Sequence, residues 1–332
     1  MPQAPKPISE TFQPVRPNAR VFMCGSVFDQ RVHFYCMQPA RPLTDASHWW
    51  LDRRAWLLAA LGAIMVASGL VHVPVWAVLG GPWEGPVTWR KPILFGISGG
   101  LTSLSLGWIW SKLPWRWGDA WLAAATAWAL FIEVVLIDLQ RWRGVGSHFN
   151  RDTPLDSVLF DAMGALIVGV TLVSLDLAVR LFRHRPLMAA DMLLAARAGL
   201  ALLVVSCLLG IWVGIHGEMQ QRIGLEPTRL GAAGVPKFPH GVAIHAIQWL
   251  PAIAWVARRA GIDERMRCRL VASATAGTLL VAVYAVLQTA LGRARFDTTP
   301  LTAAVLAAGV AGLAMPVAVT AWAMVAGRRQ AR

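Results

Sequence analysis

Ionisable side chains that could do chemistry gather around one stretch of the sequence, residues 133–161. Glu133 and Asp161 lie inside the two apolar segments that flank this stretch, and His148 lies between them. An ionisable side chain at membrane depth is costly and therefore marks a functional site. We interpret Glu133, Asp161 and His148 as catalytic groups. We expect the two carboxylates to share one interior site. Because close carboxylates in a low dielectric cannot both ionise readily, either a cation (a metal ion, protonated His148 or Arg143) lies between them or one of them holds a proton.

Five further residues carry side chains that bind transition metals. Neutral imidazole and carboxylate are ligands of zinc, iron and copper, and paired histidines hold haem iron. Their spacing matches no recognised motif such as HExxH, and the alternative is that each histidine bonds only to backbone and water. Because all five fall on one predicted side of the membrane, we predict a transition metal ion or haem as cofactor. The predicted ligands are His72, His216, Glu218, His240 and His245.

Four cations near predicted helix ends could bind an anion. A guanidinium presents a planar fork to carboxylates and phosphates, so these side chains suit a lipid phosphate, a carboxylate substrate or haem propionates. Two alternatives remain: ordinary anchoring beside interfacial tryptophans, and a simple ion pair between Asp138 and Arg141, which lie three residues apart. The predicted cofactor-binding or anion-binding residues are Arg90, Lys91, Arg141 and Arg143.

A serine nucleophile is a further alternative. The sequence contains no GxSxG motif, and Ser147 and His148 are adjacent, which does not by itself make a catalytic pair. A Ser/His/Asp site would need Ser147, His148 and Asp156 to meet across helices.

The composition places these residues in a membrane protein. Hydrophobic residues make up 56% of the 332 residues and charged residues only 15%, whereas a soluble domain carries about 25% charged residues. The net charge of +13 comes from basic residues in short loops, so we expect no nucleic-acid partner. The four cysteines show no CxxC or Cys/His metal spacing and indicate no disulfide framework.

Apolar runs predict an all-α, polytopic transmembrane helical bundle of about eight transmembrane helices. We expect a disordered, proline-rich cytoplasmic tail over residues 1–50 and a transmembrane helical domain over residues 51–328. The predicted spans are 55–78, 92–111, 119–138, 157–179, 192–215, 240–257, 270–291 and 301–326.

The distribution of basic residues predicts the orientation. Of the 31 Lys and Arg, 20 fall in the two termini and the loops that follow even-numbered spans, and 10 fall in the other loops. This excess predicts that both termini are cytoplasmic, in a multi-pass protein of the cell inner (plasma) membrane. The ionisable residues described above then face outwards.

Three segments carry a resemblance to known proteins. They read WRKP at 89–92, RGVGSHFN at 143–150 and HGVAIHAIQWLP at 240–251. They resemble a family of bacterial multi-pass membrane proteins with no assigned activity. The resemblance covers the eight-span region without the tail and implies one architecture, but it supplies no catalytic residues.

These observations favour an integral membrane protein with an outward-facing His/carboxylate site, a metal- or haem-dependent redox or hydrolytic protein. The alternative is a proton-coupled secondary transporter of a small solute, although no internal repeat supports it. A purely structural or partner-binding protein would leave Glu133 and Asp161 unexplained. Membrane lipid and a small anionic or lipid substrate are the expected partners, and whether the protein is an enzyme stays open.

Overall fold

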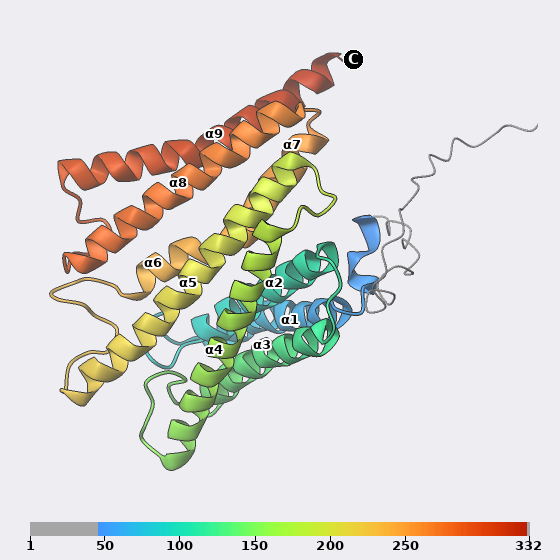
Figure 1. Ribbon diagram of the computed structural model, residues 1–332. Helices are drawn as coiled ribbons and strands as arrows, with labels where there is room; N and C mark the ends of the chain where they lie inside the picture. The colour runs from blue at the N-terminus through green and yellow to red at the C-terminus, as the bar shows by residue number, and fades with distance from the viewer. Residues whose placement is uncertain (1–45, 331–332) are drawn as a thin grey trace, which may run out of the picture. The chain divides into compact units, whose positions relative to one another are not determined.

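Long apolar runs determine the secondary structure, because in lipid the backbone N–H and C=O groups of such a run are satisfied only inside a helix. In the computed structural model, which describes residues 46–330, the regular elements are helices, and this range contains no strand (Figure 1). The elements are η1 (Ala46–Leu51), α1 (Trp56–Leu79), α2 (Arg90–Lys112), α3 (Asp119–Trp142), α4 (Pro154–Arg183), α5 (Ala190–Arg222), α6 (Lys237–Ala243), α7 (Ala246–Arg259), α8 (Glu264–Ala290) and α9 (Pro300–Gln330).

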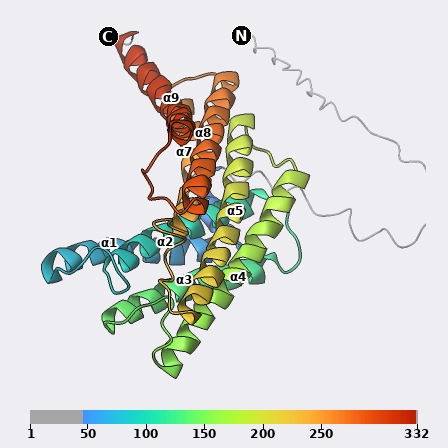
Figure 2. The ribbon, with the colours of Figure 1, turned by 90° about the vertical axis from the view of Figure 1, so that its left-hand side faces the viewer.

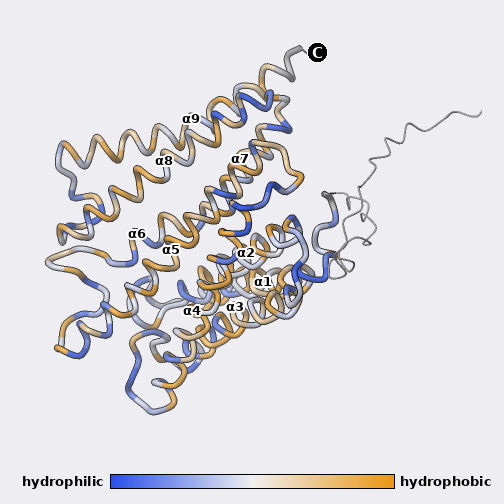
Figure 3. Tube along the Cα trace, in the orientation of Figure 1, coloured by the Kyte–Doolittle hydropathy of each residue, from blue (hydrophilic) through white to orange (hydrophobic). Residues whose placement is uncertain are grey.

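Seven helices of this range, α1 to α5, α8 and α9, are long and apolar enough to cross a membrane. Hydrophobic residues run along the helices and hydrophilic ones gather at their ends (Figure 3). The predicted all-α, multi-pass bundle is therefore confirmed. The predicted tail lies outside the described residues except for residues 46–50, which belong to η1.

The predicted span at 240–257 is not one continuous helix. Two shorter helices, α6 and α7, meet at Ile244 and His245, and both pack against α5 and α8. Together they occupy the place of one span. A break at membrane depth is tolerated where it is buried in protein or lines a polar site.

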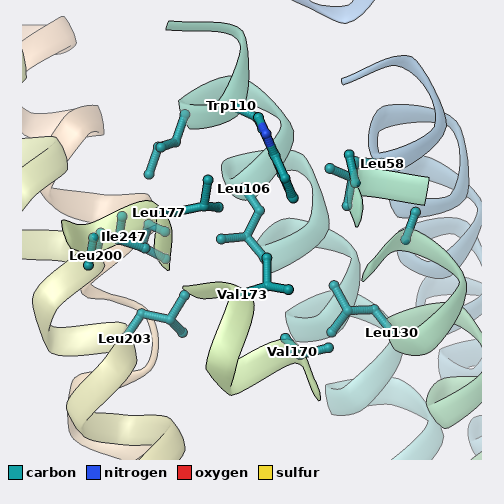
Figure 4. Packing of buried hydrophobic residues seen from close by; sticks show 14 of the residues in the cluster. Leu58, Leu106, Trp110, Leu130, Val170, Val173, Leu177, Leu200, Leu203 and Ile247 are labelled. Atoms are coloured by element: carbon teal, nitrogen blue, oxygen red, sulfur yellow. The ribbon is translucent and has the colours of Figure 1, made fainter. Parts of the chain in front are cut away.

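Hydrophobic packing joins α1–α5 and α7. Trp110 and Leu106 of α2 are completely buried against Leu58, Leu177 and their neighbours (Figure 4). In Figures 1 and 2, α8 and α9 run side by side, as do α4 and α5. This core packs α2, α3 and α4 against one another, and these helices carry much of the predicted site.

Glycines allow α1 and α2 to touch along their backbones. A Cβ atom added at Gly100 would lie 2.5 Å from the carbonyl oxygen of Gly62, and one at Gly96 would lie 2.8 Å from the Cα of Gly69. Only small residues permit this approach, which is a common way to associate membrane helices.

Buried ion pairs hold together the helix ends predicted to face the cytoplasm. The Asp119 carboxylate at the start of α3 accepts two hydrogen bonds of 2.9 Å from the Arg180 guanidinium at the end of α4. The Arg54 guanidinium lies 3.7 Å from the same carboxylate. The Asp191 carboxylate of α5 pairs with two different guanidinium groups, one at each oxygen, and that of Arg267 of α8 is the nearer, at 2.6 Å. Pairing both oxygens with guanidinium groups satisfies a buried carboxylate.

Candidate functional site

One face of α2 is polar in its N-terminal half, which is predicted to lie at the outer side of the membrane. Lys91, Ser98 and Thr102 follow helical spacing and so share a face, which continues with Leu106 and Ile109. The last two are buried and apolar. The polar part of this face therefore begins at the N-terminal end of the helix and stops near its middle.

A chain of hydrogen bonds joins Lys91 to the loop between α3 and α4. The Lys91 Nζ donates to the Oγ of Ser147 at 3.2 Å and to the carbonyl of Pro86 at 3.1 Å. The Ser147 Oγ lies 2.9 Å from the Nδ1 of His148. Ser147 is only 3% exposed. We call these three residues the Lys91–Ser147–His148 chain.

The loop that carries Ser147 is held by its backbone and by α5. Gly144 has φ +75°, and Phe149 has φ +57°, a conformation that non-glycine residues rarely adopt. The Asn150 amide donates to the carbonyl of Gly146 at 3.0 Å, and Gln221 of α5 donates to the carbonyl of Phe149 at 2.8 Å. Unusual backbone of this kind is often found at functional sites.

His148 is enclosed and uncharged at neutral pH. Burial, with a smaller effect of the nearby Lys91 cation, lowers the pKa of His148 to about 3. The rings of Phe95 and Phe160 lie 5.7 and 6.1 Å from its ring centroid. Its unprotonated Nδ1 can accept the hydroxyl hydrogen of Ser147, which in turn accepts from Lys91. Hydrogen bonds in the Lys91–Ser147–His148 chain are therefore donated from Lys91 to Ser147 and from Ser147 to His148.

The low pKa of His148 predicts a pH dependence of stability. In the unfolded chain the imidazole has a pKa of about 6.5. Below that pH the unfolded state therefore binds a proton that the folded state does not bind. Stability should fall as the pH drops from about 6.5 towards 3, by at most about 1.4 kcal/mol per pH unit from this group. Thermal unfolding in detergent should therefore depend less steeply on pH in His148→Gln than in the wild type. Equal slopes in the wild type and His148→Gln would refute the low pKa of His148.

His245 connects the α6–α7 break to the polar face of α2. Its Nε2 lies 3.5 Å from the Oγ of Ser98, and its Nδ1 lies 3.3 Å from the Oε1 of Gln248. The Gln248 amide donates to the Oγ1 of Thr102 at 3.3 Å. His240 instead turns to α5, where its Nδ1 donates to the carbonyl of Ser206 at 2.7 Å. The two histidines thus bond to different helices.

His72 uses both ring nitrogens within the protein. Its Nδ1 donates to the carbonyl of Ser68 at 2.8 Å, so its Nε2 is the acceptor for the Trp142 N–H at 3.2 Å. A metal would have to displace Trp142 to reach this nitrogen.

His216 and Glu218 lie near the C-terminal end of α5 and interact with different partners. His216 stacks on Trp212 and its Nε2 donates to the carbonyl of Arg229 at 3.0 Å. Glu218 binds Arg151, which also donates to Asp161 at 2.7 Å. Hydrogen bonds with Asp161 and then Glu218 raise the pKa of Arg151.

The structure does not bring the five predicted metal ligands together. Within residues 46–330, no three His, Cys, Asp or Glu side chains lie close enough to hold one metal ion. A metal or haem site remains a prediction from the sequence, and the arrangement of these side chains gives it no ligand set.

The predicted shared site of Glu133 and Asp161 is not found. Glu133 is buried and has no hydrogen-bond partner among the described residues. The Asp161 side chain is 64% exposed and pairs with Arg151. This expectation was wrong because a similar depth on two helices does not make both side chains face the same space. Asp161 is turned towards Arg151.

The Ser/His/Asp alternative is assembled only in part. Ser147 meets His148, but Asp156 binds elsewhere: Arg143 donates to it at 2.7 Å and Gln140 at 2.9 Å. Asp156 therefore helps to cap α4 and positions no histidine. The cation that reaches Ser147 is Lys91.

The four predicted anion-binding cations do not converge. Arg90 lies 3.5 Å from Glu84 near the surface, and Arg143 is paired as described above. The guanidinium carbon of Arg141 lies 3.8 Å from the ring centroid of Trp89. The alternative pair with Asp138 does not form, because no ion pair joins the two side chains in the described range.

Comparisons with known proteins assign no family to the chain. A scan against protein-family models, a search of curated proteins and a search of solved structures found no match. The chemistry of the site therefore rests on its own side chains. The Lys91–Ser147–His148 chain places a hydroxyl nucleophile between an amine and an imidazole, and this combination suits acyl transfer.

Proposed function

We propose that this protein is a serine hydrolase of the inner (plasma) membrane whose site opens towards the outer side. The observation that supports the proposal is the hydrogen bond from Lys91 to Ser147, made between α2 and a strained loop. Ser–Lys pairs are an established variant of nucleophile and base. The proposal keeps the hydrolytic branch of the predicted function and replaces a metal-bound water with Ser147.

Lys91 has surroundings that suit a general base. Among the described residues, its Nζ forms hydrogen bonds with Pro86 and Ser147 and no ion pair with a carboxylate. The cations Arg90 and Lys237 lie nearby. Lysines with cationic neighbours and no anionic partner are a type that enzymes use for nucleophile activation.

The proposed reaction has two steps. Lys91 first loses a proton to solvent, and its uncharged Nζ then accepts the hydrogen of the Ser147 hydroxyl. The Ser147 Oγ attacks the carbonyl carbon of an ester or amide as that proton passes to Lys91, and the leaving alcohol or amine takes the proton as the C–O or C–N bond breaks. Water then attacks the acyl-serine, gives its proton to Lys91, and the acid leaves as Ser147 recovers its hydrogen. His148 positions the hydroxyl through its Nδ1. The rings of Phe95 and Phe160 favour an acyl group with an apolar part.

The test is hydrolysis of chromogenic acyl esters of increasing chain length by protein purified in detergent. Ser147→Ala should lower kcat/KM by about a hundredfold or more, because the nucleophile is lost. Ser105→Ala is the matched control: this hydroxyl donates only to the carbonyl of Leu101 in its own helix, and its loss should leave the rate unchanged. Wild-type protein without esterase activity, or Ser147→Ala with full activity, would contradict the proposal.

The alternative of proton-coupled transport has one observation in its favour, the buried Glu133 without a described hydrogen-bond partner. A transport path also needs polar groups that reach the cytoplasmic side. The α2 face instead becomes apolar from Leu106 onward, so hydrolysis is the better supported function.

A further inference from the structure

A second group of polar side chains lies apart from the Lys91–Ser147–His148 chain. It occupies the space between the outer halves of α1 and α3, next to the residue that precedes α2. We call it the Trp89 cluster. Its members are Ser68, His72, Trp89, Asp138, Arg141 and Trp142.

Aromatic rings surround the one guanidinium of this cluster. Arg141 stacks on Trp89 at 3.8 Å, and Trp142 meets Trp89 edge to face with ring centroids 5.0 Å apart. His72 lies 5.9 Å from the Trp89 ring. Arg141 has neither a hydrogen bond nor an ion pair with the described residues, so its charge is balanced by no carboxylate in that range.

Three polar atoms of the cluster are enclosed and lack a hydrogen-bond partner in the described structure: the Nε1 of Trp89, the Nε of Arg141 and the Oδ1 of Asp138. The other oxygen of Asp138 accepts from Ser68 at 3.0 Å. A buried polar group without a hydrogen-bond partner destabilises the fold. Three of them within one turn of α3 and its neighbour indicate a missing partner.

We propose that the Trp89 cluster binds a zwitterion that carries a primary ammonium and a phosphate or carboxylate group. The anionic group accepts from Arg141 and from the Trp89 N–H. The ammonium donates to the free oxygen of Asp138, one helical turn away from Arg141. Such a ligand would form a hydrogen bond with each of the three unpartnered atoms, because the two N–H groups are donors and the carboxylate oxygen is an acceptor.

The position of the Trp89 cluster indicates how a ligand could enter it and which zwitterions could reach it. Trp142 contacts both His72 and Trp89 and is 58% exposed, so rotation of its ring is the least costly way to admit a ligand. Interfacial depth brings two sources within reach: the headgroup of an ethanolamine phospholipid, and a free amino acid or phosphoethanolamine. The inference does not depend on the proposed hydrolysis, since it uses none of the same side chains.

The test uses the full chain in nanodiscs and in detergent. Native mass spectrometry should show phosphatidylethanolamine retained about tenfold or more over phosphatidylglycerol, which has no ammonium, and over phosphatidylcholine, whose quaternary nitrogen has no hydrogen to donate. If the ligand is a solute, phosphoethanolamine or an amino acid should instead raise the melting temperature in detergent, and lipid selectivity should be absent. Either result supports the zwitterion site and identifies its source.

Variants separate the two ends of the ligand. Asp138→Asn and Arg141→Gln should each weaken binding by about tenfold, and Asp138→Asn should also erase the preference for the ammonium. Asp152→Asn and Arg222→Gln, two exposed charges of the same end of the bundle, are the controls. No selectivity among the lipids together with no response to either solute would overturn the proposal. So would unchanged binding in both Asp138→Asn and Arg141→Gln.

Discussion

Replacing Gly100 with valine should prevent α1 and α2 from packing. A Cβ at this position would lie 2.5 Å from the carbonyl oxygen of Gly62 and 2.8 Å from the backbone nitrogen of Val66, neither of which can move without moving a helix. We expect a loss of about 3 kcal/mol or more, at the upper end of overpacking costs. Unfolding of the purified protein with a denaturing detergent would measure it.

Gly164→Val provides the matched control, because it introduces the same side chain in a helix with nothing within 4 Å of the new Cβ. Its effect should stay within about 0.5 kcal/mol, as for other exposed positions. Equal stability of the two variants would show that the close approach of α1 and α2 does not hold the fold together.

Asp119→Ala should cost about 3–5 kcal/mol, because it removes two hydrogen bonds from the buried Arg180 guanidinium and leaves it only the longer contact with Asp176 at 3.6 Å. Arg54 also loses a neighbour at 3.7 Å. Thermal unfolding monitored by circular dichroism would measure the change. Asp161→Ala is the comparison: its side chain is 64% exposed, so its pair with Arg151 should contribute about 1 kcal/mol or less. A larger effect at Asp161 than at Asp119 would contradict this account of the two ion pairs.

Most of the helical architecture follows from hydropathy alone, because a long apolar run in a membrane has few alternatives to a helix. The exception is the region of α6 and α7. Its length and apolar composition predict one span, whereas the break at Ile244 and His245 depends on partners in other helices. His245 lies within hydrogen-bond reach of Ser98 of α2, and His240 bonds to Ser206 of α5. Sequence spacing does not report such contacts.

The candidate site was predicted only in part for the same reason. Sequence reasoning identified the loop between α3 and α4, since its charge and glycines are unusual between two spans. It missed the pairing of Lys91 with Ser147, which lie 56 residues apart. Helix rotation decides which side chains meet, and hydropathy does not determine rotation for α1–α4. For the same reason the sequence did not reveal that Glu133 is buried while Asp161 is exposed and paired with Arg151.

The histidines show that residues predicted to lie on the same side of a membrane need not form one site. All the predicted ligands were expected at the outer side, but sharing a side does not place them within bonding distance of one ion. His72 bonds to Ser68 and Trp142, while His216 bonds to Arg229. The ring nitrogens of each histidine form hydrogen bonds with groups close to it rather than with a shared ligand.

The most direct test of the proposed serine nucleophile is covalent labelling with a fluorophosphonate, followed by mass spectrometry of the digested protein. The hydroxyl of Ser147, hydrogen-bonded to Lys91, should displace fluoride and carry the phosphonate. Lys91→Met should slow the labelling by about a hundredfold or more, because the base that accepts the hydroxyl proton is gone. A phosphonate found on another residue, no labelling of Ser147 at all, or an unchanged rate in Lys91→Met would contradict the account.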